Sequence, residues 1–187
     1  MSLQKVSPDV DDPHLTNKAW SPDAAAVYRE LAPAVLGYLR AERTPDPEDL
    51  LGEVFLQVTR DLSRFRGDRD ALRRWVFTIA RNRLVDDHRR RSRRPRPFDG
   101  ELPDIPGQPA AEPLDPELVA ALALLTDDQR EVIVLRFIAD LPLDAVARIT
   151  KRKPGAVKAL QHRALSTLGR ILTAPLDAHT GNDEPSA

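Results

Sequence analysis

The apolar residues of this chain recur at helical spacing in two blocks, one before residue 95 and one after residue 117. In the first block the spacing predicts a helix that starts at Ser21-Pro22-Asp23, a second helix over about 47–61, and a third from about residue 71. Ser21 is expected to cap the first helix, with Pro22 in its first turn. Pro33 is expected to kink or divide that helix, because proline removes a backbone donor and clashes with the preceding turn.

The helix over 47–61 separates into an apolar arc and a polar arc on a helical wheel. The apolar arc is expected to face the core and contains Leu51, Val54, Phe55, Val58 and Leu62. The opposite arc contains Asp49, Glu53, Gln57 and Arg60, with Leu56 among them. A single leucine on a polar surface is common and needs no function. The alternative interpretation is that Leu56 marks a protein-binding face.

The third helix, within residues 71–94, carries a strong positive charge. Its apolar stripe, which is expected to be core, contains Leu72, Trp75, Val76, Ile79, Ala80 and Leu84. Its other side is lined by Arg74, Thr78, Arg81, Asn82 and Arg89. Residues 71–94 include nine arginines and two aspartates, a charge of +7. Aromatic rings on such a helix are more often core than base-stacking groups, but an arginine run cannot be core and favours contact with phosphates.

Residues 95–117 separate the two blocks. They contain seven prolines and carry a charge of −5, and such a segment lacks the apolar residues to fold alone. We therefore predict an all-α protein of two small helical domains joined by a flexible linker. The expected boundaries are a mobile arm over 1–20, a first domain over 21–94, a linker over 95–116, a second domain over 117–173, and a disordered tail over 174–187.

The second block predicts a helix-turn-helix. A helix is expected from Asp115 through Leu125, and Thr126 with Gln129 has the spacing of a capping box for the helix that follows. A short helix over 141–149, a polar break over 150–153 and a longer helix from Pro154 to about residue 172 complete the pattern.

The last helix presents a small basic face. Its expected core arc contains Val157, Leu160, Ala164, Leu168 and Ile171. The opposite arc contains Lys158, Ala159, His162, Arg163 and Ser166. Residues 151–170 carry six basic residues and no acid, which suits insertion into a DNA major groove. The alternative is a helical hairpin whose basic surface is incidental.

Composition narrows the classes of function. The 187 residues have a formal charge of −1, so the charges of the segments matter more than the total. The absence of cysteine excludes disulfides, thiolate metal sites and thiol nucleophiles, and no segment resembles a signal peptide or a membrane span. We therefore expect a cytoplasmic protein without a membrane partner.

The sequence contains no recognisable catalytic constellation. The four histidines are scattered and the eight glycines form no phosphate loop. The neighbouring carboxylates of Asp86 and Asp87 diverge on a helix and do not converge on one metal. We expect no metal, no cofactor and no enzymatic activity.

Five motifs in order resemble the extracytoplasmic-function (ECF) group of bacterial RNA polymerase sigma factors, in the sigma-70 family. In the first block these are DPEDLLGEVFLQV (46–58), RFRG (64–67) and RRWVFTIARNRLVDDHRRR (73–91), which resemble sigma region 2. In the second block LTDDQREVIVLRFIADLPLDAVARI (125–149) and GAVKALQHRAL (155–165) resemble region 4. The resemblance spans about residues 28–94 and 118–172.

The resemblance implies a factor that binds core RNA polymerase and directs promoter-specific transcription initiation. Region 2 would recognise and melt the −10 element through Phe65, Arg66, Asp68, Arg74, Trp75, Arg81, Asn82, Asp86 and Arg89. Region 4 would read the −35 element through Lys153, Gly155, Lys158, Ala159, His162 and Arg163. The arc of Asp49, Glu53, Leu56 and Gln57 would dock on the β′ clamp helices, and the second domain would lie on the β flap.

The resemblance also implies that the acidic linker would run towards the RNA exit channel. An anti-sigma factor is a plausible further partner for a member of this group.

Three departures from the group's usual pattern leave the −35 sequence open. Lys151 stands where glycine is usual, Arg152 stands where an apolar residue is usual, and Leu160 and Gln161 replace a common arginine–leucine pair. The competing hypothesis is a helix-turn-helix DNA-binding regulator that acts without core polymerase. Such a regulator would not need the first domain.

Overall fold

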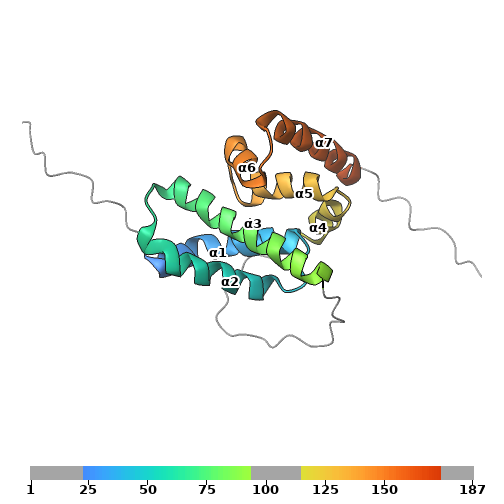
Figure 1. Cartoon of the computed structure of the whole chain (residues 1–187). Helices are drawn as coiled ribbons and strands as arrows, with labels where there is room; N and C mark the ends of the chain where they lie inside the picture. The colour runs from blue at the N-terminus through green and yellow to red at the C-terminus, as the bar shows by residue number, and fades with distance from the viewer. Residues whose placement is uncertain (1–22, 94–114, 174–187) are drawn as a thin grey trace, which may run out of the picture.

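The computed structural model describes residues 23–93 and 115–173, which form helices joined by short turns (Figure 1). The first domain consists of α1 (Ala24–Ala41), α2 (Pro47–Asp61), a 3₁₀ turn η1 (Leu62–Arg64) and α3 (Arg69–Arg93). The second consists of α4 (Pro116–Ala123), α5 (Asp127–Ile133), a π-helical turn η2 (Val134–Ile138), α6 (Leu143–Thr150) and α7 (Pro154–Leu172). The prediction of an all-α fold is confirmed. The predicted arm, tail and most of the linker lie outside the described residues.

Helix α1 differs from the sequence prediction at its N-cap and at Pro33. Asp23 is the N-cap, and its carboxylate accepts a hydrogen bond from the backbone N–H of Ala26 at 3.3 Å. The prediction that Ser21 caps the helix is therefore wrong, because the carboxylate at position 23 reaches the first free N–H groups. Pro33 lies inside one continuous helix and does not divide it, since buried Leu31 and Val35 on either side hold both halves against the core.

Helix α2 has the predicted bounds and the predicted core arc. Leu51, Val54, Phe55 and Val58 are buried, and the ring of Phe55 meets Tyr28 of α1 edge-on at 4.8 Å. Leu56 on the opposite arc is 59% exposed. The wheel therefore separated the two faces of this helix correctly.

The two domains share one core. Figure 1 shows α1 and α2 on one side of α3 and the second domain on the other, and α3 packs on α6 while α1 packs on η2 and α4. Phe77 of α3 is 0% exposed and its ring meets Tyr38 edge-on at 5.9 Å. The wheel of α3 left Phe77 outside the predicted stripe, although α3 packs on α1, α2 and α6 and so has core contacts on more than one side.

The helix-turn-helix forms from α6 and α7 as predicted, and the capping box of Thr126 and Gln129 is present at the start of α5. The turn between α6 and α7 begins at Lys151, whose φ of 56° is left-handed. Glycine is the residue that adopts this conformation without strain. The sequence departure at position 151 therefore places a strained residue at the C-cap of α6.

Replacing Lys151 by glycine should stabilise the folded chain by about 1 kcal/mol, because the left-handed conformation costs an L-residue about that much. The midpoint of thermal unfolding followed by circular dichroism should rise by about 2–6 °C. Lys158→Gly is the matched control: it removes the same side chain from the exposed middle of α7, where glycine should destabilise by about 1 kcal/mol. A drop in the midpoint for both variants would contradict the prediction.

Candidate nucleic-acid interface

A ring from the loop before α3 lies against a ring of α3, with the two planes tilted to each other. The ring of Phe65 lies 5.3 Å from that of Trp75, with 32° between the planes, and both side chains are partly exposed. Gly67 has a φ of 156°, and a Cβ there would lie 2.8 Å from the Cβ of Ala71 and 3.0 Å from Cζ of Phe65. Position 67 therefore requires glycine if the loop is to close beneath the Phe65 ring.

The polar residues of this loop hold its shape. Asp68 accepts a hydrogen bond from the backbone N–H of Ala71 at 2.7 Å and so supports the start of α3. The guanidinium of Arg66 donates to the carbonyl oxygens of Ser63 and Phe65 at 2.9 and 2.7 Å. Arg66 and Asp68, both predicted to contact DNA, therefore also form hydrogen bonds within the loop and with the start of α3.

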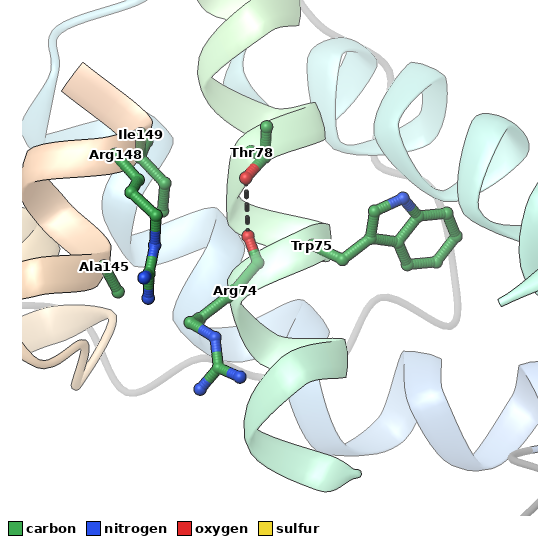
Figure 2. Close-up of a pocket in the computed structure, with 6 residues that line it drawn as sticks. All are labelled: Arg74, Trp75, Thr78, Ala145, Arg148 and Ile149. Atoms are coloured by element: carbon green, nitrogen blue, oxygen red, sulfur yellow. Dashed lines mark hydrogen bonds between the residues drawn. The ribbon is translucent and has the colours of Figure 1, made fainter. Parts of the chain in front are cut away.

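A cavity of about 440 Å³ lies between α3 and α6. Its lining residues are Arg74, Trp75, Thr78, Ala145, Arg148 and Ile149. Figure 2 shows the guanidinium groups of Arg74 and Arg148 on the same side of α3, whereas the indole of Trp75 points the other way. The hydroxyl of Thr78 donates to the carbonyl oxygen of Arg74 at 2.7 Å (Figure 2). Arg148 is paired with Asp144 at 2.6 Å, so Arg74 is the one cation of this lining that has no ion pair among the described residues.

The remaining predicted −10 residues differ in accessibility. Arg81 is largely buried and pairs with Glu131 of α5 at 2.7 Å. Asn82, Asp86 and Arg89 are exposed, and Arg89 lies 3.9 Å from Asp86. The structure therefore brings Phe65 and Trp75 together and leaves the later residues of α3 in a row towards its C-terminal end. Arg81 does not face solvent in this arrangement.

The arginine-rich end of α3 is helical, and its charge is partly neutralised. Arg91 pairs with Asp46 at 2.6 Å and with Asp87 at 2.8 Å. Arg90 lies 3.5 Å from Glu53 of α2. The sequence predicted a run available for phosphates, but it could not show that acids from α2 and its N-cap lie beside that run.

The predicted docking arc on α2 includes residues of α3. Gln57 accepts hydrogen bonds from Arg83 at 3.1 and 2.8 Å, and Glu53 lies 3.8 Å from the same guanidinium. Asp49 is exposed beside Leu56. Arg83 and Arg90 are thus part of this face, and no local sequence pattern indicated them because each pairs with a residue on another helix.

The first half of α7 presents the predicted basic face. Lys158, Ala159, His162 and Arg163 are exposed, while Val157, Leu160, Ala164 and Leu168 face the core. Lys153 is the N-cap residue and Gly155 is exposed with open space around it. Over residues 23–93 and 115–173, no acidic side chain forms an ion pair with these four basic residues (Lys153, Lys158, His162, Arg163). The face is therefore available to an anionic ligand.

Within the described ranges no helix is long and apolar enough to cross a membrane, and no cluster of metal-binding side chains occurs.

Comparisons with known proteins agree with this architecture. Residues 27–94 match the family model described as Sigma-70 region 2, and residues 121–169 match Sigma-70, region 4. The chain is 31% identical over 175 residues to the ECF RNA polymerase sigma factor ShbA of Streptomyces griseus, covering 82% of this chain and 91% of that protein. It is 34% identical over 132 residues to SigX of Bacillus subtilis, covering 65% and 68%.

A further relative is longer than this chain. The ECF RNA polymerase sigma factor BldN of Streptomyces coelicolor is 36% identical over 143 residues, and the match covers 72% of this chain but 54% of BldN.

Solved structures show the same fold. The sigma factor RpoE of Bartonella quintana, in complex with the anti-sigma factor NepR, superposes with a TM-score of 0.63 at 25% identity, covering 79% of this chain and 94% of that one. CnrH, in complex with the cytosolic domain of CnrY, superposes with a TM-score of 0.55 at 23% identity, covering 80% and 86%.

The fold and the two matched regions define a sigma-70-type transcription initiation factor. More narrowly, the chain belongs to the ECF group of RNA polymerase sigma factors.

Proposed function

We propose that this chain binds core RNA polymerase and directs it to start transcription at specific promoters. The observation that carries the proposal is the presence, in one chain, of a region 2 domain with an aromatic pair beside a basic helix and a region 4 domain with a basic helix-turn-helix face. A regulator that acts without polymerase needs the second domain alone, so this alternative is not favoured.

The first domain would recognise and open the −10 element. Strand separation requires a receptor for an unstacked base and a basic track for the released strand. The Phe65–Trp75 pair offers the aromatic surface. Arg74, next to Trp75 in the chain, and Arg89, further along α3, offer cations. On this proposal, α3 stacks a base near its start and contacts phosphates towards its end.

The second domain would read the −35 element. Helix α7 projects Lys158, His162 and Arg163 from one exposed face close to its N-terminus. Arginine and lysine are the usual readers of guanine in the major groove, and the N-terminal residues of a recognition helix make the base contacts.

An anti-sigma factor is the further partner that the comparisons support. RpoE of Bartonella quintana was solved in complex with the anti-sigma factor NepR. By analogy we propose that a protein of this class regulates the present chain.

In vitro transcription tests the proposed function. The chain added to core polymerase should give promoter-dependent transcripts from a matched genomic library, whereas the isolated chain should bind duplex promoter DNA weakly. The absence of any promoter-dependent transcript would overturn the proposal. Tight duplex binding without core would instead support the helix-turn-helix regulator.

Leu56→Asp should weaken binding to core polymerase by at least about tenfold, because it places a charge at the centre of the proposed apolar contact. The first domain should remain folded, since Leu56 is 59% exposed and lies outside the buried core. Ala25→Asp adds the same charge to an exposed position in the first turn of α1 and should leave affinity unchanged. Titration of labelled core with each variant measures this, and equal affinities for both would exclude Leu56 from the docking face.

A further inference from the structure

Arg152, in the turn before α7, is joined to the start of α5. Its guanidinium donates a hydrogen bond to the carboxylate of Asp128 at 2.5 Å, and the two side chains are 33% and 54% exposed. The backbone N–H of Arg152 donates to the carbonyl oxygen of Ala147 in α6 at 2.9 Å. Arg152 therefore connects the end of α6 and the start of α5 at the point where the chain enters α7 at Pro154.

A second polar contact joins the middle of α7 to the end of the α5–η2 segment. Nε of Arg136 in η2 donates to Oε1 of Gln161 at 3.3 Å, and both side chains are partly buried. The same guanidinium donates to the carbonyl oxygen of Leu141, so the backbone also fixes its direction. On a helical wheel Gln161 lies between the core arc of α7 and the exposed face that carries Lys158.

Two contacts at separate points restrict the rotation of α7 about its own axis, and α7 packs on α5 along this side. Side chains reach about 5–6 Å from a helix axis, so a rotation of about 20° would move their ends by roughly 2 Å. Such a movement would break the hydrogen bond to Gln161 and displace His162 and Arg163 by a similar distance. A binding site of defined geometry needs its side chains held within about 0.5 Å and 10–20°, and hydrogen bonds from surrounding residues supply this restraint.

The arginine at position 152 is not explained by stability. Its Nε is buried, and among the described residues none accepts a hydrogen bond from it. A buried donor without a partner is unfavourable, and a partly exposed ion pair contributes little. The residue after a left-handed helix C-terminus, here Lys151, is frequently apolar and packs on the preceding helix. A role in orienting α7 accounts for a polar side chain at this position.

We propose that these two contacts set the orientation of α7 on the DNA, so that Arg152 and Gln161 help to determine the −35 preference without touching the bases. Both are positioning residues, which act through the exposed face of α7. The inference rests on the proposed function, because it assumes that α7 reads the −35 element. It adds that the sequence that is read depends on Asp128 of α5 and Arg136 of η2.

Selection of −35 sequences by holoenzyme tests this inference. Core polymerase is combined with the full chain, and bound templates are sequenced from a library randomised across the −35 element. Arg152→Leu and Gln161→Leu should each reduce the preference for the favoured base by about fivefold or more at one or more positions, since a well-aligned base contact contributes about 5- to 150-fold discrimination. Gln161→Leu should change affinity for a scrambled −35 element by less than about twofold, because every cation that can contact phosphate is kept.

The partner residues separate positioning from direct contact with DNA. Asp128→Ala removes an anion and should not weaken binding to a scrambled −35 element, but it should reduce base preference as Arg152→Leu does. The double variant should be no worse than either single variant, because both changes break the same contact.

Asp144→Ala is the matched control for Asp128→Ala. Both aspartates lie in the first turn of a helix of the second domain, with side chains 60% and 54% exposed, and both pair with an arginine. The partner of Asp144 is Arg148 on the same helix, α6, so its loss leaves α7 unrestrained by nothing that held it before. Asp144→Ala should therefore keep the base preference of the unmodified chain.

The outcomes distinguish this inference from the proposed function. If the unmodified holoenzyme prefers particular −35 sequences and both leucine variants keep that preference, the positioning role is wrong and the proposed function stands. If the unmodified holoenzyme has no −35 preference, reading by α7 is itself wrong. A changed preference in Gln161→Leu that Arg136→Met does not reproduce would show that Gln161 contacts DNA directly.

Thermal unfolding followed by circular dichroism checks that the variants fold. Arg152→Leu should lower the midpoint by less than about 2 °C, because a partly exposed ion pair is lost together with a buried donor that had no partner. A fall of more than about 5 °C would show that Arg152 supports the fold, and this would contradict a role confined to positioning.

Discussion

Replacing Trp75 by alanine should slow promoter opening by about five- to hundred-fold while leaving core binding unchanged, because stacking a base on an aromatic ring is worth about 1–3 kcal/mol. The indole is partly exposed, lies against the Phe65 ring and points away from the second domain (Figure 2). Its loss therefore removes an accessible stacking surface without opening a large cavity in the core. The measurement is the rise in fluorescence of 2-aminopurine placed in the −10 element after mixing with holoenzyme.

A template with a pre-opened −10 element provides the control for this experiment. If Trp75 acts in opening, transcription by the Trp75→Ala holoenzyme should recover on that template. Trp75→Phe should retain most of the opening rate on duplex DNA, since it keeps an aromatic face. A defect that persists on the pre-opened template would show that Trp75 supports folding or core binding, and the proposed role would be wrong.

The double variant Lys158→Ala/Arg163→Ala should weaken promoter binding by holoenzyme by about 100-fold or more, because each contact to a base or phosphate is worth about 1–3 kcal/mol. Both side chains are exposed and neither contributes to the core of the second domain. The slope of log affinity against log salt should also fall by up to about 1.8, as expected when two phosphate neutralisations are lost.

Arg170→Ala is the matched control for α7. Arg170 lies two turns beyond Arg163 on the same exposed face, about 10 Å further along the helix axis. Its removal lowers the charge of the same helix but should change affinity less than twofold. On a template with a scrambled −35 element the difference between the double variant and the unmodified chain should narrow to the part that comes from lost phosphate contacts, and a difference as large as on the intact element would contradict a sequence-reading role.

Local sequence patterns predicted the features that depend on interactions within a few residues. The bounds of α2, the capping box at Thr126 and the two faces of α7 follow from periodicity and side-chain capping within a few residues. The start of α1 was placed two residues early, because serine, proline and aspartate at 21–23 are all compatible with a helix start and the carboxylate position decides among them.

The features that the sequence could not predict all depend on long-range packing. Glu131 lies 50 residues from Arg81 in the chain, and Gln57 lies 26 residues from Arg83. Nothing in either local pattern identifies the partner. Phe77 lay outside the predicted core stripe, and its ring is buried against Tyr38 of α1, which lies 39 residues earlier in the chain. The exposure of Lys158, His162 and Arg163 was predictable from the periodicity of α7, whereas the burial of Arg81 was not, because its partner Glu131 lies on another helix.

The hydrogen bonds from Arg83 to Gln57 have a consequence for how this surface can evolve. Arg83 belongs to α3, the helix that would open DNA, and its acceptor Gln57 belongs to the arc of α2 that would bind the polymerase. A substitution at Arg83 would thus disturb both properties at once, and a compensating change on one helix could not repair the other. The orientation of α3 relative to the polymerase surface is therefore constrained by both properties together. Relatives with a different promoter preference are expected to carry their substitutions elsewhere on α3 or on α7.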